Sequence, residues 1–430
     1  MRPSARRPRP GPKPSRPGGP PSELIIEAVG GEGDGVAAGP VFVPFTLPGE
    51  RVLASGGGER RELVEVQSAS ADRVTPPCPH FGVCGGCALQ HWAHAPYLAW
   101  KVERLAATLA RQQIETEILA PFAAEPGTRR RVALHARRGS REAARLGFKA
   151  RRSWELVDIA ACPISDPAIQ AALPALKRLA APLLEHPKSA PTLHVTLTST
   201  GLDIEISGVE RKSGGLSADA RVQVAERAAA AGFARVTLEG EAAYMARQPR
   251  VTLGQASVNL PAGAFLQATP QAQAAMTAFV AGAAAGASRI ADLYCGVGTF
   301  TFALAEIAQV HAADFDPEAI RALSSALAGA PGLKGVTPEA RDLTRRPVLA
   351  EELKKTDVVV FDPPRAGAAE QTAELARSGV ARVIGVSCNP ATFARDARTL
   401  IDAGFTLDRV LPVDQFLWSP HIELVGVFSR

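Results

Sequence analysis

A regular alternation of short apolar runs and helix-like segments fills the C-terminal part of this chain. The apolar runs cover residues 290–294, 310–314, 357–361 and 382–386, and mostly alanine-rich segments separate them. Apolar runs joined by helices are typical of strands in a parallel sheet that helices cover on both faces. The pattern predicts an α/β fold with a doubly wound, mostly parallel sheet over residues 263–430.

The residues before this domain differ from it in composition and differ among themselves. Residues 1–21 are rich in proline, arginine and glycine, which predicts a disordered basic tail. Short strand-like runs and glycine-rich turns over residues 22–74 predict a small OB-like β-barrel, a fold that often binds oligonucleotides. Residues 75–262 join a cysteine-rich segment to strand-like and alanine-rich runs, which predicts a central α+β domain.

Positive charge is concentrated in two places, although the formal net charge is only +5. One place is the tail. The other is a basic run that consists of Arg129, Arg130, Arg131, Arg137, Arg138, Arg141, Arg145, Lys149, Arg151 and Arg152. Such concentrations favour a polyanionic partner, most simply nucleic acid. The alternative is a solvated face of the fold and, for the tail, a solubilising arm.

The chain shows no signal for a membrane or for secretion. No segment approaches the length of a membrane span, and the N-terminus lacks the apolar stretch of a secretory signal. Six cysteines in 430 residues, three of them within ten residues, do not resemble a disulfide framework. We therefore expect a reducing, cytoplasmic location and no membrane partner.

A glycine loop follows the first predicted strand of the α/β domain, in the sequence Asp292–Phe300. Gly296 and Gly298 would let a ligand approach the backbone at the start of the next helix. The loop lacks the third glycine of the dinucleotide fingerprint, and Asp314 ends the next strand, where a carboxylate can bind ribose hydroxyls. These features favour a nucleoside without phosphates, and S-adenosylmethionine is the natural candidate. The alternative is a structural turn beside a capping aspartate.

Two further motifs follow predicted strands of the same domain. Asp362-Pro363-Pro364-Arg365 places two prolines at the carboxyl end of a strand, where they would form a rigid wall of a site. Cys388, in Ser387-Cys388-Asn389-Pro390, would lie at the same edge of the sheet and is a candidate nucleophile. The alternative for Cys388 is a packed, inert thiol.

A second group of cysteines has the spacing of a metal site. Cys78, Cys84 and Cys87 lie close together, with two glycines between the last two, and Cys162 can be a fourth ligand. Four thiolates suit either Zn²⁺ or a [4Fe–4S] cluster, and the spacing does not decide between them.

Several motifs of the chain occur together in known enzymes. They are Cys78–Cys87, Gly263–Gln267, Asp292–Phe300, Asp362–Arg365, Ser387–Thr392, and Pro412–Phe416 followed by His421–Glu423. In this order they resemble the uracil-C5 RNA methyltransferases, most closely the iron–sulfur branch that methylates 23S ribosomal RNA. The resemblance covers nearly all of residues 22–430. It implies a Rossmann-like methyltransferase domain and identifies the barrel as an RNA-binding TRAM domain.

The resemblance also implies a chemical role for two residues. Carbon 5 of uracil is a poor nucleophile until a thiolate adds to carbon 6, and the resemblance places that addition on Cys388. The family's carboxylate base, which removes the carbon 5 proton, corresponds to Glu423. Apolar neighbours of Glu423 suggest partial burial, which would raise its pKa, whereas a helix N-terminus would favour the thiolate of Cys388.

The family pattern further implies which residues bind the methyl donor and the cluster. The donor contacts carry over to Gln267, Tyr294, Thr299, Asp314, Asp342 and Asp362. Asp314 stands where the family usually has Glu, and Thr299 and Asp342 stand where close relatives often have Asn. The resemblance favours [4Fe–4S] over zinc at the four cysteines. Phe265 and Phe393 could line the uracil pocket, although core packing is the commoner role.

Three other functions compete with this interpretation. A tRNA uracil-C5 methyltransferase is possible, but that branch usually lacks the barrel and the cluster. An iron–sulfur RNA-binding protein without catalysis would not need Cys388, Glu423 and Asp314 together. A DNA cytosine-C5 enzyme would have its thiol in a Pro-Cys pair. RNA, with ribosomal RNA preferred over transfer RNA, is the expected partner, and no obligate protein partner is evident.

Overall fold

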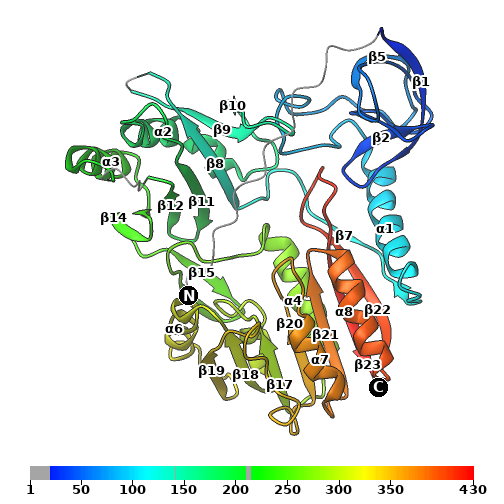
Figure 1. Ribbon diagram of the computed structural model, residues 1–430. Coiled ribbons are helices and arrows are strands. Elements are labelled where there is room, and N and C mark those ends of the chain that lie inside the picture. The colour runs from blue at the N-terminus through cyan, green and yellow to red at the C-terminus, as the bar shows by residue number, and fades with distance from the viewer. Residues whose placement is uncertain (1–19, 141, 210–214) are drawn as a thin grey trace, which may run out of the picture. The chain divides into compact units, whose positions relative to one another are not determined.

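The computed structural model describes residues 20–140, 142–209 and 215–430 (Figure 1). They form two compact units, which we describe separately. The first contains residues 20–97, Leu146–Ala161 and Trp418–Pro420, and the second contains Leu98–Arg145, Cys162–Leu417 and His421–Arg430. Within the described residues, no helix is long and apolar enough to cross a membrane. Residues 1–19 and Arg141, which belong to the predicted basic tail and basic run, lie outside this description.

The second unit contains the predicted doubly wound sheet. Its strands are β17 (Arg289–Leu293), β18 (Gln309–Asp314), β19 (Val336–Ala340), β20 (Val358–Phe361), β21 (Arg382–Ser387), β22 (Thr406–Asp414), β23 (Glu423–Ser429) and the short β6 (Glu117–Ile118) and β7 (Phe122–Ala123). The order is β19-β18-β17-β20-β21-β23-β22-β6, and β7 pairs with β22. The first five strands are parallel, and β23 is antiparallel to both β21 and β22. The predicted fold class is confirmed.

Helices cover both faces of this sheet. One core contains buried residues of α4 (Pro270–Ala283), α5 (Thr301–Ile307) and α6 (Pro317–Leu327), and the other contains those of α1 (His94–Ala110), α7 (Ala369–Arg377) and α8 (Pro390–Asp402). Successive strand residues alternate between the cores: Val358 and Val360 belong to the first, Val359 and Phe361 to the second. This alternation explains the continuous apolar runs, because a strand covered on both faces has no solvent-facing side.

The helices α4, α6 and α8 begin with the same sequence signal. A capping side chain accepts a backbone hydrogen bond, and proline is the first helical residue, at Thr269–Pro270, Asp316–Pro317 and Asn389–Pro390. Proline fixes a helical φ and lacks the N–H that would have no intrahelical partner there. These signals fix where the loops after the strands end, and the loops carry the candidate site.

The same unit contains a second sheet that matches the predicted α+β region. It includes β8 (Arg131–Arg137), β11 (Thr192–Thr198), β12 (Gly201–Ser207), β13 (Arg235–Leu238) and β14 (Glu241–Met245), in the order β8-β11-β12-β13-β14. The helices of this region are α2 (Pro167–Ala180), η1 (Ala181–Leu183) and α3 (Ala218–Ala230), and a hairpin of β15 (Arg250–Leu253) and β16 (Ala256–Asn259) follows. Only β12 and β13 are parallel, as expected for strands joined through the helix α3.

The first unit contains the predicted small barrel-like sheet. Its strands are β1 (Ser22–Val29), β2 (Asp34–Ala37), β3 (Val41–Pro44), β4 (Arg51–Ser55) and β5 (Glu62–Ser68), antiparallel in the order β3-β2-β1-β4-β5. Hydrogen bonds from Phe42 N to Glu59 O and from Arg61 N to Phe42 O join the two edges. A hairpin of β9 (Arg145–Lys149) and β10 (Leu156–Asp158) completes the elements named here.

Candidate active site

The candidate site lies at the carboxyl edge of the parallel strands. Strand β18 ends at Asp314, and Asp362 and Cys388 directly follow β20 and β21. Glu423 reaches the same region from the opposite direction, because it is the first residue of the antiparallel strand β23 and pairs with Val413. Ligands of open α/β sheets bind at this edge, so the topology gathers polar residues that are far apart in sequence.

Cys388 is half-buried immediately before the cap of α8. The neighbouring Asn389 side chain accepts from Ala391 N and donates to the Arg365 carbonyl at 3.0 Å, which fixes the loop that carries the thiol. Burial raises the pKa of Cys388 to about 11, and the charges of Glu423 and Asp362 act in the same direction, against Arg365. The thiol form therefore predominates at neutral pH, which differs from the expected thiolate-favouring setting.

Glu423 is 3% exposed and belongs to a hydrogen-bonded chain of side chains. Gln415 Nε2 donates to Glu423 Oε2 and to Gln267 Oε1, both at 2.8 Å, and Gln267 Nε2 donates to Asp362 Oδ2 at 3.0 Å. Burial, reinforced by the charge of Asp362, raises the pKa of Glu423 well above its ordinary value. The expected burial of Glu423 and its consequence for the pKa are therefore present.

The glycine loop holds the predicted carboxylate of the second strand. Asp314 Oδ2 accepts from Gly296 N, and Oδ1 accepts from Asp316 N, both at 2.9 Å. Gly298 has a φ of +98°, and a Cβ there would lie 2.7 Å from side-chain atoms of Leu323 and Phe302. Only glycine fits this position, because a side chain there would collide with two buried residues.

The remaining predicted donor-binding residues surround this loop. Tyr294 begins the loop with an unusual φ of +62°, and Thr299 is half-buried near its end. Asp342 follows β19 and accepts hydrogen bonds from Thr344 N and Arg345 N, so its carboxylate also shapes its own turn. Strained conformations of non-glycine residues such as Tyr294 are concentrated at functional sites.

Asp292 is a site residue to which the sequence interpretation assigned no role. It is fully buried at the end of β17, and its Oδ2 accepts from the Thr301 hydroxyl at 2.5 Å. Its Oδ1 has no hydrogen-bond partner among the described residues. Burial raises its pKa to about 7, and the charges of Asp362 and Asp314 contribute. Its position before the glycine loop was the sequence signal that could have identified Asp292 as a site residue.

The burial of Asp292 predicts that the free energy of unfolding depends on pH. The folded chain binds the Asp292 proton more tightly than the unfolded chain, whose ordinary pKa is 3.8, so the free energy of unfolding should fall as pH rises from about 4 to about 7. We expect Asp292→Asn to raise the free energy of unfolding by about 2 kcal/mol at pH 8 and to change it little at pH 4. Urea denaturation at both pH values measures this, and equal stability at pH 8 would contradict it.

The basic run is used in part for internal contacts. Arg130 donates from Nε to the Gln267 carbonyl at 3.0 Å and from Nη2 to Gln273 Oε1 at 2.6 Å, and Arg131 donates to the Leu266 carbonyl at 2.7 Å. In the first unit, Arg151 and Arg152 both form ion pairs with Asp34. Arg130 and Arg131 therefore hold the segment that contains Gln267, a role that a charge count could not predict.

The two candidate pocket phenylalanines have different environments. Phe393 is 3% exposed and packs 5.9 Å from Phe428, ring centre to ring centre, so it is a core residue. Phe265 is 65% exposed, and the Arg131 guanidinium lies 4.9 Å from its ring centre. Phe265 alone of the two is therefore accessible to a nucleobase.

The four cysteines of the predicted cluster are divided between the two units. Cys78, Cys84 and Cys87 belong to the first unit, where Gly86 N donates to Cys84 Sγ at 3.4 Å, and Cys162 belongs to the second. Across the described ranges, no group of three or more His, Cys, Asp and Glu side chains is positioned to hold a metal ion. The thiolate ligand set remains a prediction from the sequence.

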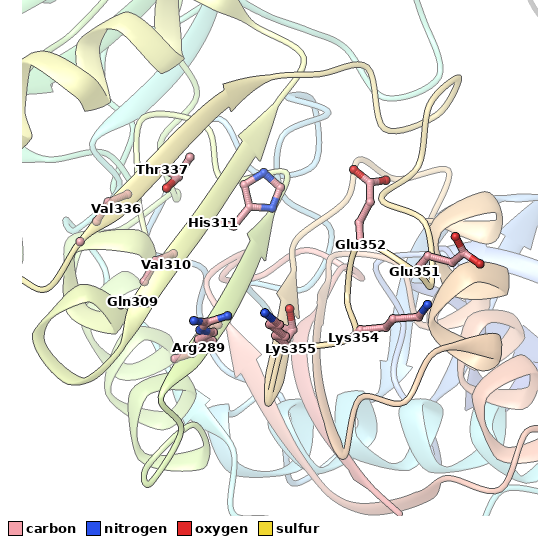
Figure 2. A pocket seen from close by; sticks show the side chains of 13 residues that line it. Arg289, Gln309, Val310, His311, Val336, Thr337, Glu351, Glu352, Lys354 and Lys355 are labelled. Carbon is pink, nitrogen blue, oxygen red and sulfur yellow. The ribbon is translucent and has the colours of Figure 1, made fainter.

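A pocket of about 580 Å³ lies at the opposite edge of the doubly wound sheet (Figure 2). Arg289, Gln309 and Val336, which line it, are the first residues of β17, β18 and β19. Figure 2 shows that Lys354 and Lys355 also line it, and these residues precede β20. None of the predicted site residues lines this pocket, so the chemistry of the candidate site lies elsewhere.

Comparisons with known proteins identify the family of the chain. Residues 216–430 match the family described as tRNA (Uracil-5-)-methyltransferase. An uncharacterized RNA methyltransferase of Caulobacter vibrioides is 66% identical over 95% of this chain and 100% of its own length. The 23S rRNA (uracil(1939)-C(5))-methyltransferase RlmD of Halomonas elongata is 34% identical over 93% of this chain and 88% of its own.

A solved structure shares the fold. The Pyrococcus abyssi tRNA (uracil-54, C5)-methyltransferase, in complex with S-adenosyl-L-homocysteine, superimposes with a TM-score of 0.73. It is 23% identical, and the match covers 95% of this chain and 100% of that chain. The chain therefore belongs to the tRNA (uracil-5-)-methyltransferase family and is an RNA methyltransferase of the uracil-C5 type.

Proposed function

We propose that this enzyme transfers a methyl group from S-adenosylmethionine to carbon 5 of a uridine in RNA, with Cys388 as nucleophile and Glu423 as base. The observation that carries the proposal is the pairing of Ser387 with Leu424, which brings the adjoining thiol of Cys388 and the buried carboxylate of Glu423 to the same end of two neighbouring strands. Both lie at the edge of the sheet where the glycine loop and Asp314 are found.

Cys388 and Glu423 act in sequence in this mechanism. The thiol of Cys388 loses its proton to solvent, its sulfur bonds to carbon 6, and the electron pair of the carbon 5–carbon 6 double bond moves toward the carbon 4 carbonyl. Bound S-adenosylmethionine would supply the electrophilic methyl group that carbon 5 attacks, and S-adenosylhomocysteine would be the leaving group. Glu423 removes the proton from carbon 5, the double bond re-forms, and the sulfur–carbon 6 bond breaks to release Cys388.

The environments of Cys388 and Glu423 affect their steps differently. Burial raises the pKa of Cys388, so the thiol must lose its proton before the sulfur attacks, and the charge of Arg365 favours the thiolate. The raised pKa of Glu423 makes it a stronger base than an exposed carboxylate. A uridine must leave its stack to reach these groups, and the exposed ring of Phe265 is available to receive it.

The proposed donor contacts are those carried by Gln267, Tyr294, Thr299, Asp314, Asp342 and Asp362. Asp314 supports this assignment because two backbone N–H groups fix its carboxylate at the end of β18, where ribose hydroxyls bind in such folds. Asp292 joins this group by position. Its unpartnered Oδ1 and raised pKa suit a neighbour that carries positive charge.

We propose 23S ribosomal RNA as the substrate, with transfer RNA as the alternative. The 34% identical relative from Halomonas elongata supports ribosomal RNA, and the N-terminal β1–β5 sheet fits a TRAM-type RNA-binding module. The test incubates the enzyme and labelled donor with each RNA and identifies the modified nucleoside. We expect 5-methyluridine in ribosomal RNA, and 5-methyluridine only in transfer RNA would overturn this assignment.

We also propose that Cys78, Cys84, Cys87 and Cys162 hold a [4Fe–4S] cluster in a reducing cytoplasm. The support is the donor set, since four thiolates are the usual ligands of such clusters. No step of methyl transfer involves the cluster. Protein purified without oxygen should contain about four iron and four sulfide per chain, in line with the cluster's composition. Stoichiometric zinc in that preparation would contradict the assignment.

A further inference from the structure

We propose that Gln415 is a positioning residue, which holds Oε2 of Glu423 so that Oε1 is the oxygen that receives the uracil proton. This inference rests on the proposed function, because it assumes that Glu423 is the base. Gln415 follows β22 and is 3% exposed, so its amide must find partners inside the protein. Its side chain lies between Gln267, which donates to Asp362, and the proposed base Glu423.

One backbone group determines the orientation of the Gln415 amide. Ala268 N lies 2.8 Å from Gln415 Oε1, and a backbone N–H can only donate. The other end of the amide is therefore the nitrogen, which lies 2.8 Å from Gln267 Oε1 and 2.8 Å from Glu423 Oε2. Both hydrogens of Gln415 Nε2 are used, one on each oxygen.

The same argument extends to Gln267. Its oxygen faces Gln415, so its nitrogen faces Asp362 Oδ2 and donates to it. The two amides thus connect the two carboxylates, and each carboxylate accepts a hydrogen bond. Reversing either amide would bring two donors or two acceptors together, so the chain has a single satisfied arrangement.

The backbone beside Gln415 is fixed by a buried ion pair. Lys101 Nζ lies 2.6 Å from Asp414 Oδ1, and neither side chain is exposed. Asp414 Oδ1 also accepts from Phe416 N at 3.1 Å, so the residues on both sides of Gln415 are held. These contacts hold the backbone of Gln415 in place, so its amide has a fixed position next to Glu423, as a positioning role requires.

The charged groups around Glu423 give Gln415 a specific role, which is to stabilise the ionised carboxylate. Asp362 repels a charged Glu423, and the thiol of Cys388 adds no positive charge. Arg365 acts on Cys388, and Lys101 is paired with Asp414. The hydrogen bond from Gln415 is the contact that favours the charged form of Glu423 against burial and against Asp362.

The two oxygens of Glu423 are consequently different. Oε2 accepts the Gln415 hydrogen bond, which lowers the basicity of that oxygen. The described residues make no hydrogen bond to Oε1. Oε1 is therefore the oxygen that takes the carbon 5 proton, and Gln415 both aims it and opposes the rise in the Glu423 pKa that burial and Asp362 cause.

The test compares pH profiles of kcat for the full-length enzyme and Gln415→Met, with RNA and donor saturating. Methionine has a similar volume but cannot donate, so Glu423 should hold its proton to a higher pH. We expect the midpoint of the acid limb to rise by about one pH unit and kcat at pH 7 to fall roughly tenfold. Above the shifted limb, kcat should recover to within a few-fold of the parent enzyme.

Gln371→Met is the matched control. Gln371 is also fully buried, and both ends of its amide bond to the backbone of Val348 and not to a proposed site residue. A merely structural role for Gln415 would make the two variants alike, with lower stability and unshifted acid limbs. An unshifted limb in a folded Gln415→Met enzyme would overturn the inference. The proposed function itself would fail differently, by normal turnover of Glu423→Gln.

Discussion

Replacement of Cys388 by alanine is expected to lower kcat by a factor on the order of 10⁴ or more, the scale at which enzymes lose a covalent nucleophile. Without the sulfur, carbon 5 of uracil is not activated, and none of the neighbouring groups can add to carbon 6 in its place. The neighbours are the carboxylates of Asp362 and Glu423 and the guanidinium of Arg365, which are weaker nucleophiles or none. Single-turnover methyl transfer to RNA measures the loss.

The same variant should keep its fold and its ligands. Cys388 is half-buried in a loop whose backbone is held by Asn389, so removal of one sulfur leaves the loop contacts intact. Dissociation constants for RNA and for the methyl donor should therefore change by less than about tenfold, or 1.4 kcal/mol. Turnover within tenfold of the parent enzyme would contradict the nucleophile assignment.

Replacement of Lys101 by methionine is expected to lower the free energy of unfolding by about 3–5 kcal/mol, because it leaves the carboxylate of Asp414 buried without its cation. Burial lowers the pKa of Lys101 to about 8 even though Asp414 opposes the change, so desolvation of this pair is costly. Urea denaturation followed by circular dichroism measures the loss.

The double variant Lys101→Met with Asp414→Leu is the control for that prediction. Removing both charges removes the desolvation cost together with the attraction, so most of the lost stability should return. Catalysis should not return with it, because Asp414 also fixes Phe416 N beside Gln415. A Lys101→Met protein as stable as the parent would contradict the account of this buried pair.

Local sequence patterns were sufficient to predict the strands of the doubly wound sheet and the loops that follow them. The strands of the doubly wound sheet could be predicted because each is a continuous apolar run, and the loops because they begin with Asp292, Asp314 or Asp362 near strand ends. Gly298 could be recognised as a loop residue from its type. These signals are local, since they depend on residues within one strand or one turn.

The hydrogen-bonded chain of the site could not be predicted in this way. Gln267 lies 95 positions before Asp362 and 148 positions before Gln415. Only the folded sheet brings these amide and carboxylate groups together. The internal contacts of two residues in the basic run could not be predicted for a related reason. Arg130 and Arg131 use their charge on backbone carbonyls of the Gln267 segment, and no count of charges reveals such partners.

The central claim, covalent catalysis by Cys388, is tested most directly with RNA that contains 5-fluorouridine. Fluorine on carbon 5 cannot be removed by Glu423 as a proton, so Cys388 should stay bonded to carbon 6 after methyl transfer. We predict a denaturation-resistant protein–RNA adduct that requires the methyl donor and maps to Cys388, and no adduct with Cys388→Ala. An adduct that persists in Cys388→Ala, or its absence in the parent enzyme while normal RNA is methylated, would contradict the claim.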